Sequence, residues 1–419
     1  MSRWISGFIF VSWMVVTASI GASTALAQDA TPGATAQPVA SAQEPQSSGE
    51  SVLKASADWI QNKFGGSGQA KDGFYPEFNG LPAGSGIVAG PGFRQRFFEG
   101  RALVSASGAY SVSRGKFGQA TFELPRLADD HLSVGAQVKR QDFTRVSFFG
   151  IGPASAEGDR TTYGLKNTDY TGFATLKPKG QLTVGGHFGF SQHVDIVPPR
   201  SATYPSTQDL FNDSTAPGLT GTPAFLHGDA YVDVDTRDHH SYPTSGGDYR
   251  VTFLNYNDRD FGLYSFRRVE AEASQYVPLH KHSIIALRGR VAGSGTGSGE
   301  VVPYYLLPAL GGSKSLRGYS DYRFMDRNLL LLSAEYRLTV FGALDGVLFY
   351  DTGKVAPRFG DLSLSNLRKS YGVGFRYHSD KTTFARLDIG RSQEGTRFLI
   401  SVGEVFRPGH GSVSIPYVP

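Results

Sequence analysis

From Gly73 onward, apolar and polar residues alternate along most of this chain of 419 residues. A period of two places successive side chains on opposite faces of a β-strand. The segment 328–338 shows the pattern clearly, because one face is apolar and the other is polar. The two sets are Leu330, Leu332, Ala334, Tyr336 and Leu338 against Ser333, Glu335 and Arg337. The same alternation recurs in many segments and predicts an all-β chain.

Beyond the N-terminal segment, no apolar run approaches the roughly 18 residues of a membrane-spanning helix, so a helical membrane protein is excluded. The chain has 52 Gly, 20 Tyr and 29 Phe, with a mean hydropathy of -0.23. A transmembrane β-barrel has such a composition because its lumen-facing and lipid-facing residues average out. A water-soluble β-sandwich also alternates, but charges on the polar face and aromatic residues on the apolar face favour the barrel.

The connections between the predicted strands alternate between short and long, as in outer-membrane barrels. We expect periplasmic turns at 128–130, 177–180 and 280–282, and extracellular loops at 191–223 and 292–323. The strands predicted after the second long loop are 328–340, 345–354, 370–379, 383–391 and 397–406. With those before it, the first two being 74–78 and 87–94, they predict a closed transmembrane antiparallel β-barrel of about 16 strands. Closure is expected because an open edge in lipid would leave backbone groups unpaired.

The N-terminal residues have the pattern of a secretory signal peptide. Arg3 supplies the positive charge, residues 5–20 supply the apolar core, and Ala25-Leu26-Ala27 supplies the cleavage site. Residues 28–49 are Ala, Pro, Gln, Ser and Thr, which cannot build a core. Residues 50–64 are predicted to form either one short amphipathic helix or a frayed connector. The expected division is therefore a signal peptide at 1–27, a linker at 28–71, a barrel at 72–406 and a tail at 407–419.

The net charge of +4 and pI near 9.0 give no case for nucleic-acid binding without a clustered basic stripe. The absence of Cys removes disulfides and thiolate metal sites and is compatible with an oxidising compartment. No G-x-S-x-G, H-E-x-x-H or Walker motif is present, so we expect no enzyme, no cofactor and no metal. A Ser-His-acid esterase triad remains open, because such triads assemble in space.

Residues 311–319 run Gly-Gly-Ser-Lys-Ser-Leu-Arg-Gly-Tyr, which predicts a loop because glycine weakens a strand interior. At Arg317, Gly318 and Tyr319 the chain resembles the BamA/TamA-type outer-membrane barrels, also called the bacterial surface antigen family. In that family an Arg-Gly-aromatic motif lies on a long extracellular loop folded into the lumen, where its arginine meets an acid on the inner wall. The family's Asp-x-Gly partner matches Asp351. The resemblance extends from about residue 74 to residue 406.

The resemblance predicts an ion pair between Arg317 and Asp351 inside the barrel. An arginine is a permanent planar cation that suits bidentate pairing with a carboxylate. Glu335 and Asp388 project to the same side of their strands and are further candidate acidic partners. Two roles of this pair remain open, and they do not exclude each other. The pair can pin the loop and stabilise the barrel, or it can take part in gating or insertion.

Residues 235–247 are similar to another signature of the family, the Asp-Thr-Arg-Asp…Pro…Gly periplasmic turn. The motif begins at Asp235, and Pro243 and Gly246 favour a tight reversal of the chain. We expect Asp238, beside Arg237, to tie the turn together. His239 and His240 lie near these acids. A metal site is disfavoured because adjacent residues of an extended chain point in opposite directions.

The last predicted strand resembles the C-terminal sorting signal of outer-membrane barrels, an alternating strand that ends in Phe. Phe398, Ile400, Val402 and Phe406 are expected to face lipid, with Glu404 near the interface where a charge costs less. In the usual pattern the Phe is the final residue. Here residues 407–419 follow, which is a departure from the pattern.

The resemblance implies a protein of the bacterial outer membrane that assists insertion or translocation of proteins, or alternatively of lipids. Its implied partners are outer-membrane lipids, lipopolysaccharide and client outer-membrane or secreted proteins; the sequence does not indicate an oligomeric state. Two alternatives remain: a passive pore, and a surface antigen or adhesin acting through its long loops. Family members carry periplasmic POTRA domains, but 28–71 is too short for one. We therefore expect a POTRA-less barrel.

Overall fold

The computed structural model describes residues 72–403 apart from 79–80, 82–84, 87 and 201–202, together with residues 54 and 406. The predicted signal peptide, nearly all of the predicted linker with its short helix, Glu404 and the tail at 407–419 lie outside the described residues.

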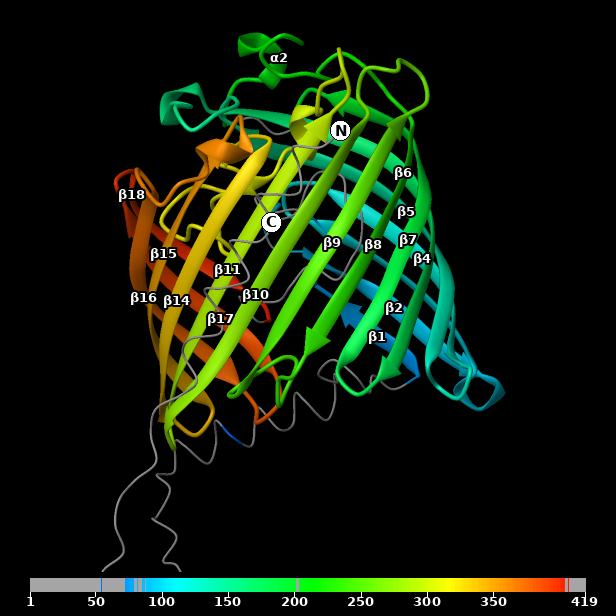
Figure 1. Cartoon of the computed structure of the whole chain (residues 1–419), viewed down its shortest axis with the longest axis vertical. Helices are drawn as coiled ribbons and strands as arrows, with labels where there is room; N and C mark the ends of the chain where they lie inside the picture. The colour runs from blue at the N-terminus through cyan, green and yellow to red at the C-terminus, as the bar shows by residue number, and fades with distance from the viewer. Residues whose placement is uncertain are drawn as a thin grey trace, which may run out of the picture. The chain divides into compact units, whose positions relative to one another are not determined.

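Sixteen strands form one antiparallel sheet in chain order (Figure 1). They are β1 (Gly73–Glu77), β2 (Val88–Phe97), β3 (Ala102–Ser111), β4 (Lys116–Leu127), β5 (Leu132–Phe148), β6 (Thr161–Lys179), β7 (Leu182–Val197), β8 (Phe225–Asp235), β9 (Gly246–Asp258), β10 (Phe266–His280), β11 (Ser283–Thr296), β14 (Asn328–Phe341), β15 (Leu344–Ala356), β16 (Arg368–His378), β17 (Thr383–Ser392) and β18 (Gly395–Ser401). The prediction of an all-β chain with about 16 strands is confirmed. The last strand ends earlier than predicted, at Ser401.

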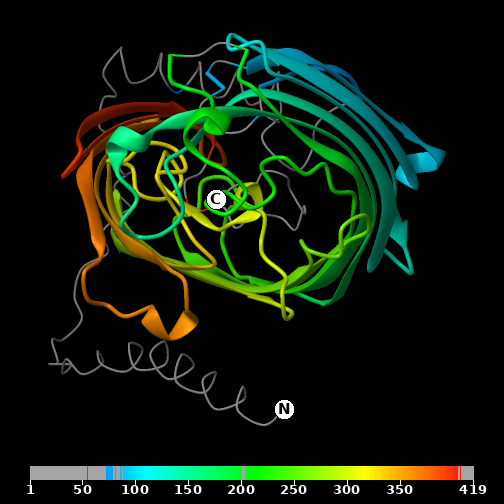
Figure 2. The same ribbon diagram turned by 90° about the horizontal axis from the view of Figure 1, so that it is seen from above.

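Seen from above, the sheet curves into a barrel that surrounds several loops (Figure 2). Its first and last strands are β1 and β18, and no backbone pairing between these two is present among the described residues. A small second sheet inside the barrel pairs β12 (Ala309–Leu310) with β13 (Phe324–Met325). The helical pieces are α2 (Thr207–Leu210), η1 (Phe98–Gly100), η2 (Glu157–Asp159), η3 (Tyr304–Leu306) and η4 (Phe359–Asp361). Among the described residues, no helix has the length and hydropathy needed to cross a membrane.

The predicted two faces of the strands are present in the wall. Leu348 on β15 and Tyr371 on β16 point outward and are 58% and 57% exposed, as lipid-facing side chains of a barrel must be. Glu335 on β14 and Asp388 on β17 point inward and are fully buried. The alternation in the sequence therefore sorts apolar side chains to the outside and charged ones to the lumen.

Short turns lie at one rim and long connections at the other, as expected. The turn between β10 and β11 is only residues 281–282, and Ala128, Asp129 and Asp130 adopt positive φ in the turn between β4 and β5. The longest connections are 198–224 and 297–327. Their apolar residues form a buried cluster with the ends of β5 to β10, whose aromatic members are Phe143, Phe148, Tyr163, Phe225, Tyr256, Tyr264, Phe266, Tyr304, Tyr305 and Tyr322. The lumen at the long-loop rim is therefore filled with side chains.

Candidate functional site

The lumen loop, residues 297–327 between β11 and β14, enters the barrel and forms the β12–β13 hairpin (Figure 2). Its tight turn needs glycine, because Gly311 and Gly312 have φ values of 121° and 86°. A Cβ at Gly311 would lie 2.0 Å from the carbonyl oxygen of Ser320. The glycine pair predicted as a loop signal therefore lets the chain turn back inside the lumen.

Apolar side chains hold the lumen loop against the inner wall. Tyr319 of the predicted motif is buried and packs edge-on against Phe324 of β13, with ring centroids 5.1 Å apart. This cluster joins loop residues to the wall strands β11, β14 and β15, and its members are Ala292, Leu310, Leu316, Tyr319, Phe324, Leu329, Leu331 and Val355. The tucked position that the resemblance implies is therefore stabilised by burial of apolar surface.

Arg317 of the lumen loop contacts all three acids proposed from the sequence. Its Nε and Nη2 donate to the two carboxylate oxygens of Asp351 at 2.8 and 2.7 Å, which is a bidentate pair. Its Nη1 donates to Glu335 and lies 3.8 Å from a carboxylate oxygen of Asp388. The guanidinium carbon also lies 3.6 Å from the ring centroid of Phe349, a cation–π contact.

Three further arginines, which the sequence reasoning did not single out as site residues, complete the site. Arg337 Nε donates to Glu335 at 2.8 Å, and Arg376 lies 3.1 Å from Glu335 and 2.7 Å from Asp388. Arg386 lies 3.6 Å from Asp388. We define the arginine cluster as Arg317, Arg337, Arg376, Arg386, Glu335, Asp351 and Asp388. The signal that could have revealed the three arginines was their position on the inward face of β14, β16 and β17.

The arginine cluster is fully buried, and its three acids differ in the number of arginines that pair with them. Glu335 and Asp388 each contact Arg376 and one more wall arginine in addition to Arg317. Within the described residues, Asp351 forms an ion pair with Arg317 alone, and Ser370 Oγ lies 3.4 Å from it. Asp351 therefore depends on the lumen loop for its compensating charge.

Two glycines let the backbone of the lumen loop approach the wall closely. A Cβ at Gly318 would lie 2.8 Å from backbone atoms of Arg391 on β17. A Cβ at Gly390 on the same strand would lie 2.6 Å from the carbonyl oxygen of Arg317. Ser392 Oγ then donates to the carbonyl of Gly318 at 2.7 Å. The glycine of the predicted motif is thus required by contact with β17, and not by a positive φ.

Comparison with known proteins identifies the family of the chain. A family model described as the Omp85 superfamily domain matches residues 98–406, which is most of the chain. The chain belongs to the Omp85 superfamily. It is accordingly an outer-membrane β-barrel protein of a Gram-negative bacterium. Within the described residues, no POTRA-like domain accompanies the barrel.

Three solved structures are similar to the chain. BamA from Haemophilus ducreyi lacking POTRA domains 1-3 matches with a TM-score of 0.57 and 16% identity, over 80% of this chain and 70% of that chain. CdiB from Acinetobacter baumannii has a TM-score of 0.47 and 12% identity, over 76% of this chain and 57% of its own. CdiB from Escherichia coli has a TM-score of 0.48 and 15% identity, over 78% and 58%. The BamA match shows the barrel fold, and the chain spans less than two thirds of either CdiB chain.

The periplasmic turn motif of this Omp85 barrel is held together by Asp238 and by Arg237, each with its own partners. Asp238 ties the turn together as expected, but not through Arg237, whose side chain lies 2.7 Å from Asp235 and 2.7 Å from Asp248 of β9. Asp238 instead accepts from the hydroxyl and backbone N–H of Thr244. The partners of Arg237 were not evident from the sequence, because Asp235 and Asp238 both lie close to it in the chain and Asp248 lies on the next strand.

Burial raises the pKa of the Asp238 carboxyl, but hydrogen bonds within the turn outweigh it. The hydroxyl of Thr244 and the backbone N–H groups of Thr244, Ser245 and His239 donate to it, and together they hold its pKa below its ordinary value. The ionised carboxylate therefore organises the turn. Gly246, with φ of 85°, ends the turn where β9 begins, and a Cβ there would lie 2.1 Å from the carbonyl oxygen of Thr236.

The turn also reaches strands far from it in the sheet, which the sequence did not reveal. We define the periplasmic strap as residues 236–245. Ser241 forms a parallel bridge with Thr382, before β17. The Tyr242 hydroxyl donates to Asp345 of β15 at 2.8 Å, and its ring stacks on His378 of β16 at 3.9 Å. The strap therefore fastens the β8–β9 end of the barrel to β15, β16 and β17.

The predicted sorting signal divides into two parts. Phe398 and Ile400 are exposed on the outside of β18, at 72% and 84%, and Val402, directly after the strand, is 56% exposed. Phe406 is fully buried in an apolar cluster with Tyr276, so the expectation that it faces lipid is wrong. The strand ends at Ser401, and beyond it the period of two no longer sets the direction of a side chain.

The described residues bear on two alternatives from the sequence, a catalytic triad and a metal site. Ser191 and His227 both bind the same carboxylate, that of Asp169, at 2.5 and 2.7 Å. In a catalytic triad the serine hydroxyl donates to the imidazole, but the Ser191 hydroxyl donates to the carboxylate of Asp169. His240 Nδ1 lies 2.7 Å from Asp235, and no group of three or more metal-ligating side chains occurs among the described residues.

Proposed function

We propose that this Omp85 protein assists the insertion or translocation of proteins at the outer membrane, in the manner of the BamA/TamA-type barrels, with client outer-membrane or secreted proteins as its partners. The observation that carries the proposal is the arginine cluster. A loop that only narrowed a pore would not need a buried bidentate pair, a second carboxylate and two glycines at its contact with the wall. The match of the superfamily domain over residues 98–406 supports the same proposal.

The arginine cluster suits a latch that has two positions. While Arg317 occupies the cluster, the lumen loop is fixed to β14, β15 and β17. Withdrawing Arg317 leaves Asp351 buried without a cation, which is costly enough to make the change all-or-none. In the proposed mechanism a client supplies the energy for this change by adding its strands to the barrel. No covalent chemistry is involved.

The filled lumen argues against the passive pore. The aromatic cluster at the long-loop rim and the lumen loop both occupy the space that a diffusing solute would need. The adhesin alternative places function in the long loops, above all residues 191–223, but Ala216 and Leu219 of this loop are buried in the cluster that also contains lumen-loop residues. Trimming this loop should leave assembly of client barrels intact.

The test is Arg317→Ala in the full-length protein, expressed in cells depleted of the native copy. Arg126→Ala is the matched control, because Arg126 lies at the same 2.7 Å from Asp130 but is an exposed surface pair. The proposal expects both variants to reach the membrane folded, and only Arg317→Ala to reduce the amounts of client proteins in a census of the outer membrane. A normal census with the folded Arg317→Ala variant would refute it.

A further inference from the structure

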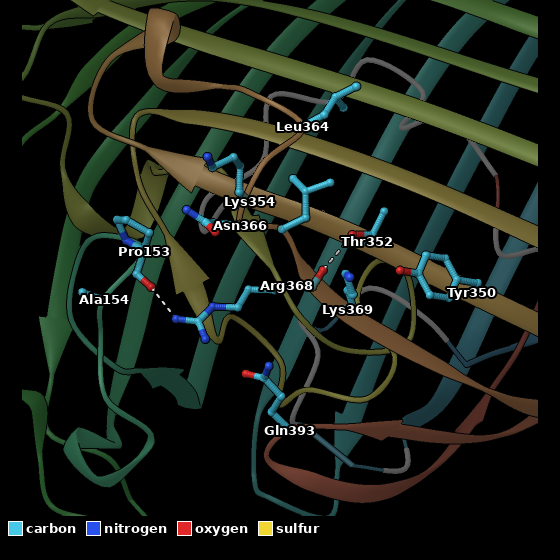
Figure 3. Close-up of a pocket in the computed structure, with 11 residues that line it drawn as sticks. Pro153, Ala154, Tyr350, Thr352, Lys354, Leu364, Asn366, Arg368, Lys369 and Gln393 are labelled. Atoms are coloured by element: carbon cyan, nitrogen blue, oxygen red, sulfur yellow. Dashed lines mark hydrogen bonds between the residues drawn. The ribbon is translucent and has the colours of Figure 1, made fainter.

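A cavity of about 810 Å³ lies near the long-loop rim, beside β15 and β16 (Figure 3). Its lining comes from these strands, from the connection 357–367 between them, and from residues 153–154 and 393 of neighbouring loops. Figure 3 shows Tyr350, Thr352 and Lys354 along one strand, with Lys369 beside Thr352. The arginine cluster contributes none of the residues that line it.

The strand register places the cavity at the boundary between lipid and water. Leu348, Tyr350 and Tyr371 are exposed on the outer face, and Tyr350 pairs with Tyr371 across the two strands. Tyrosine at this position marks the interface of a membrane barrel. Thr352 and Lys369 form the next outward-facing pair, roughly 7 Å further toward the rim, since a strand rises about 3.4 Å per residue. The cavity therefore lies at the depth of the lipid head groups.

The lining of the cavity is cationic. Lys354, Arg368 and Lys369 contribute three positive charges, and none of the eleven lining residues is acidic. Neither lysine forms an ion pair with a carboxylate in the part of the chain that the structure describes. Asn366 and Gln393 add amide donors. Such a set of donors without a counter-charge recognises an anion.

The connection above β15 is held in place over the cavity. Lys354 Nζ donates to Ser363 Oγ at 3.3 Å and to the carbonyl of Ser365 at 3.1 Å. Between them, Leu364 is 67% exposed although it lines a polar cavity. Arg368 Nη2 donates to the carbonyl of Pro153 at 2.9 Å and so fixes the opposite wall. Polar donors and an exposed leucine at one rim match a molecule with both a charged and an apolar part.

We propose that this cavity binds the phosphorylated head group of an outer-leaflet lipid. The phosphate lies between Lys354 and Lys369, which act as point charges on flexible stems, and the amides of Asn366 and Gln393 donate to the remaining oxygens. The acyl chains extend along Tyr350 and Leu348 on the outer face of β15. The site holds whether or not the protein inserts other proteins, since it shares no residue with the arginine cluster.

The test measures lipid binding to the purified full-length protein in detergent by native mass spectrometry. The probes are lipid A with both phosphates, the same lipid after removal of its phosphates, and inorganic phosphate as a competitor. The variant Lys354→Gln/Lys369→Gln is compared with Lys177→Gln/Lys179→Gln, which removes the same charge at the other end of the barrel. The cavity variant is expected to bind phosphorylated lipid A roughly 30-fold more weakly, while the control is unchanged.

Three results would overturn the proposal: equal binding of the two lipid A forms, an equal loss in the control variant, or displacement of the lipid by inorganic phosphate, which would assign the cavity to a soluble anion. A shift in gel mobility on heating shows that each variant is folded. Should the double variant not fold, Lys369→Gln alone serves, because the ammonium of this exposed lysine donates no hydrogen bond within the described residues. It is expected to weaken binding roughly fivefold, and no weakening counts against the site.

Discussion

Replacing Arg317 by methionine removes the charge of the lumen loop while keeping much of the side-chain volume. Glu335 retains Arg337 and Arg376, and Asp388 retains Arg376. Asp351 alone loses its ion-pair partner and is left buried, with Ser370 Oγ at 3.4 Å. The cost of the substitution should therefore come from one carboxylate.

The size of the effect follows from burial. Leaving one charge of a buried pair uncompensated costs about 3–5 kcal/mol of the free energy of unfolding. Removing that charge as well, in Arg317→Met/Asp351→Asn, should restore at least about 2 kcal/mol, because the two sites couple. Arg126→Ala breaks an exposed pair at the same 2.7 Å distance, and it should cost less than about 1 kcal/mol.

The measurement is unfolding of the purified protein by guanidinium, followed by far-ultraviolet circular dichroism. Circular dichroism is used in place of tryptophan fluorescence because the three tryptophans, Trp4, Trp13 and Trp59, lie outside the described residues. A loss below 1 kcal/mol for Arg317→Met would show that the cluster does not fasten the loop. A double variant as unstable as Arg317→Met would show that Asp351 is not the source of the cost.

Three further predictions concern the loop contact and the strap. Gly318→Ala should lower the free energy of unfolding by roughly 1–3 kcal/mol in the same titration, because its Cβ clashes with β17. Gly295→Ala is the control and should cause no such loss, because the space around Gly295 is open. Equal losses in the two variants would contradict this prediction. Because the pKa of Asp238 is lower in the folded turn than its ordinary value of about 3.9, its contribution is fully present above about pH 4 and is lost as the pH falls through the folded pKa. Hydrogen exchange should show the turn amides losing protection in acid, and Asp238→Asn should lack this protection at neutral pH; unchanged protection in that variant would refute the role. Ser241→Cys/Thr382→Cys should form a disulfide on oxidation in this cysteine-free chain, and absence of the cross-link on a denaturing gel would disprove the bridge.

The sequence predicted the wall of the barrel well, because a period of two fixes which side chains face lipid. The faces of 328–338 follow directly from that period, and Arg317 and Asp351 followed from a family motif whose basic half lies on a loop and whose acidic half lies on a predicted strand. Arg337 was recognised only as a polar-face residue. Whether such a residue joins a cluster depends on the register between strands, which alternation alone does not set.

The errors lie where the strands end. Phe406 was assigned to lipid by extending the alternation past Ser401, although the chain leaves the sheet there. The ion pairs of Arg237 with Asp235 and Asp248 were not predicted, because a turn can direct a side chain toward either of the strands that it joins. The contact of Tyr242 with Asp345 joins strands that are distant in the sheet, and no local pattern encodes such a contact.

The periplasmic strap also constrains the order in which the barrel can form. Tyr242 and its acceptor Asp345 are 103 residues apart in the chain, and the strands between them must be laid down first. In an assembly intermediate that stops before β15, Tyr242 therefore lacks both its acceptor Asp345 and the ring of His378 on which it stacks. The contacts of the strap with β15, β16 and Thr382 can therefore form only after these C-terminal residues have been placed.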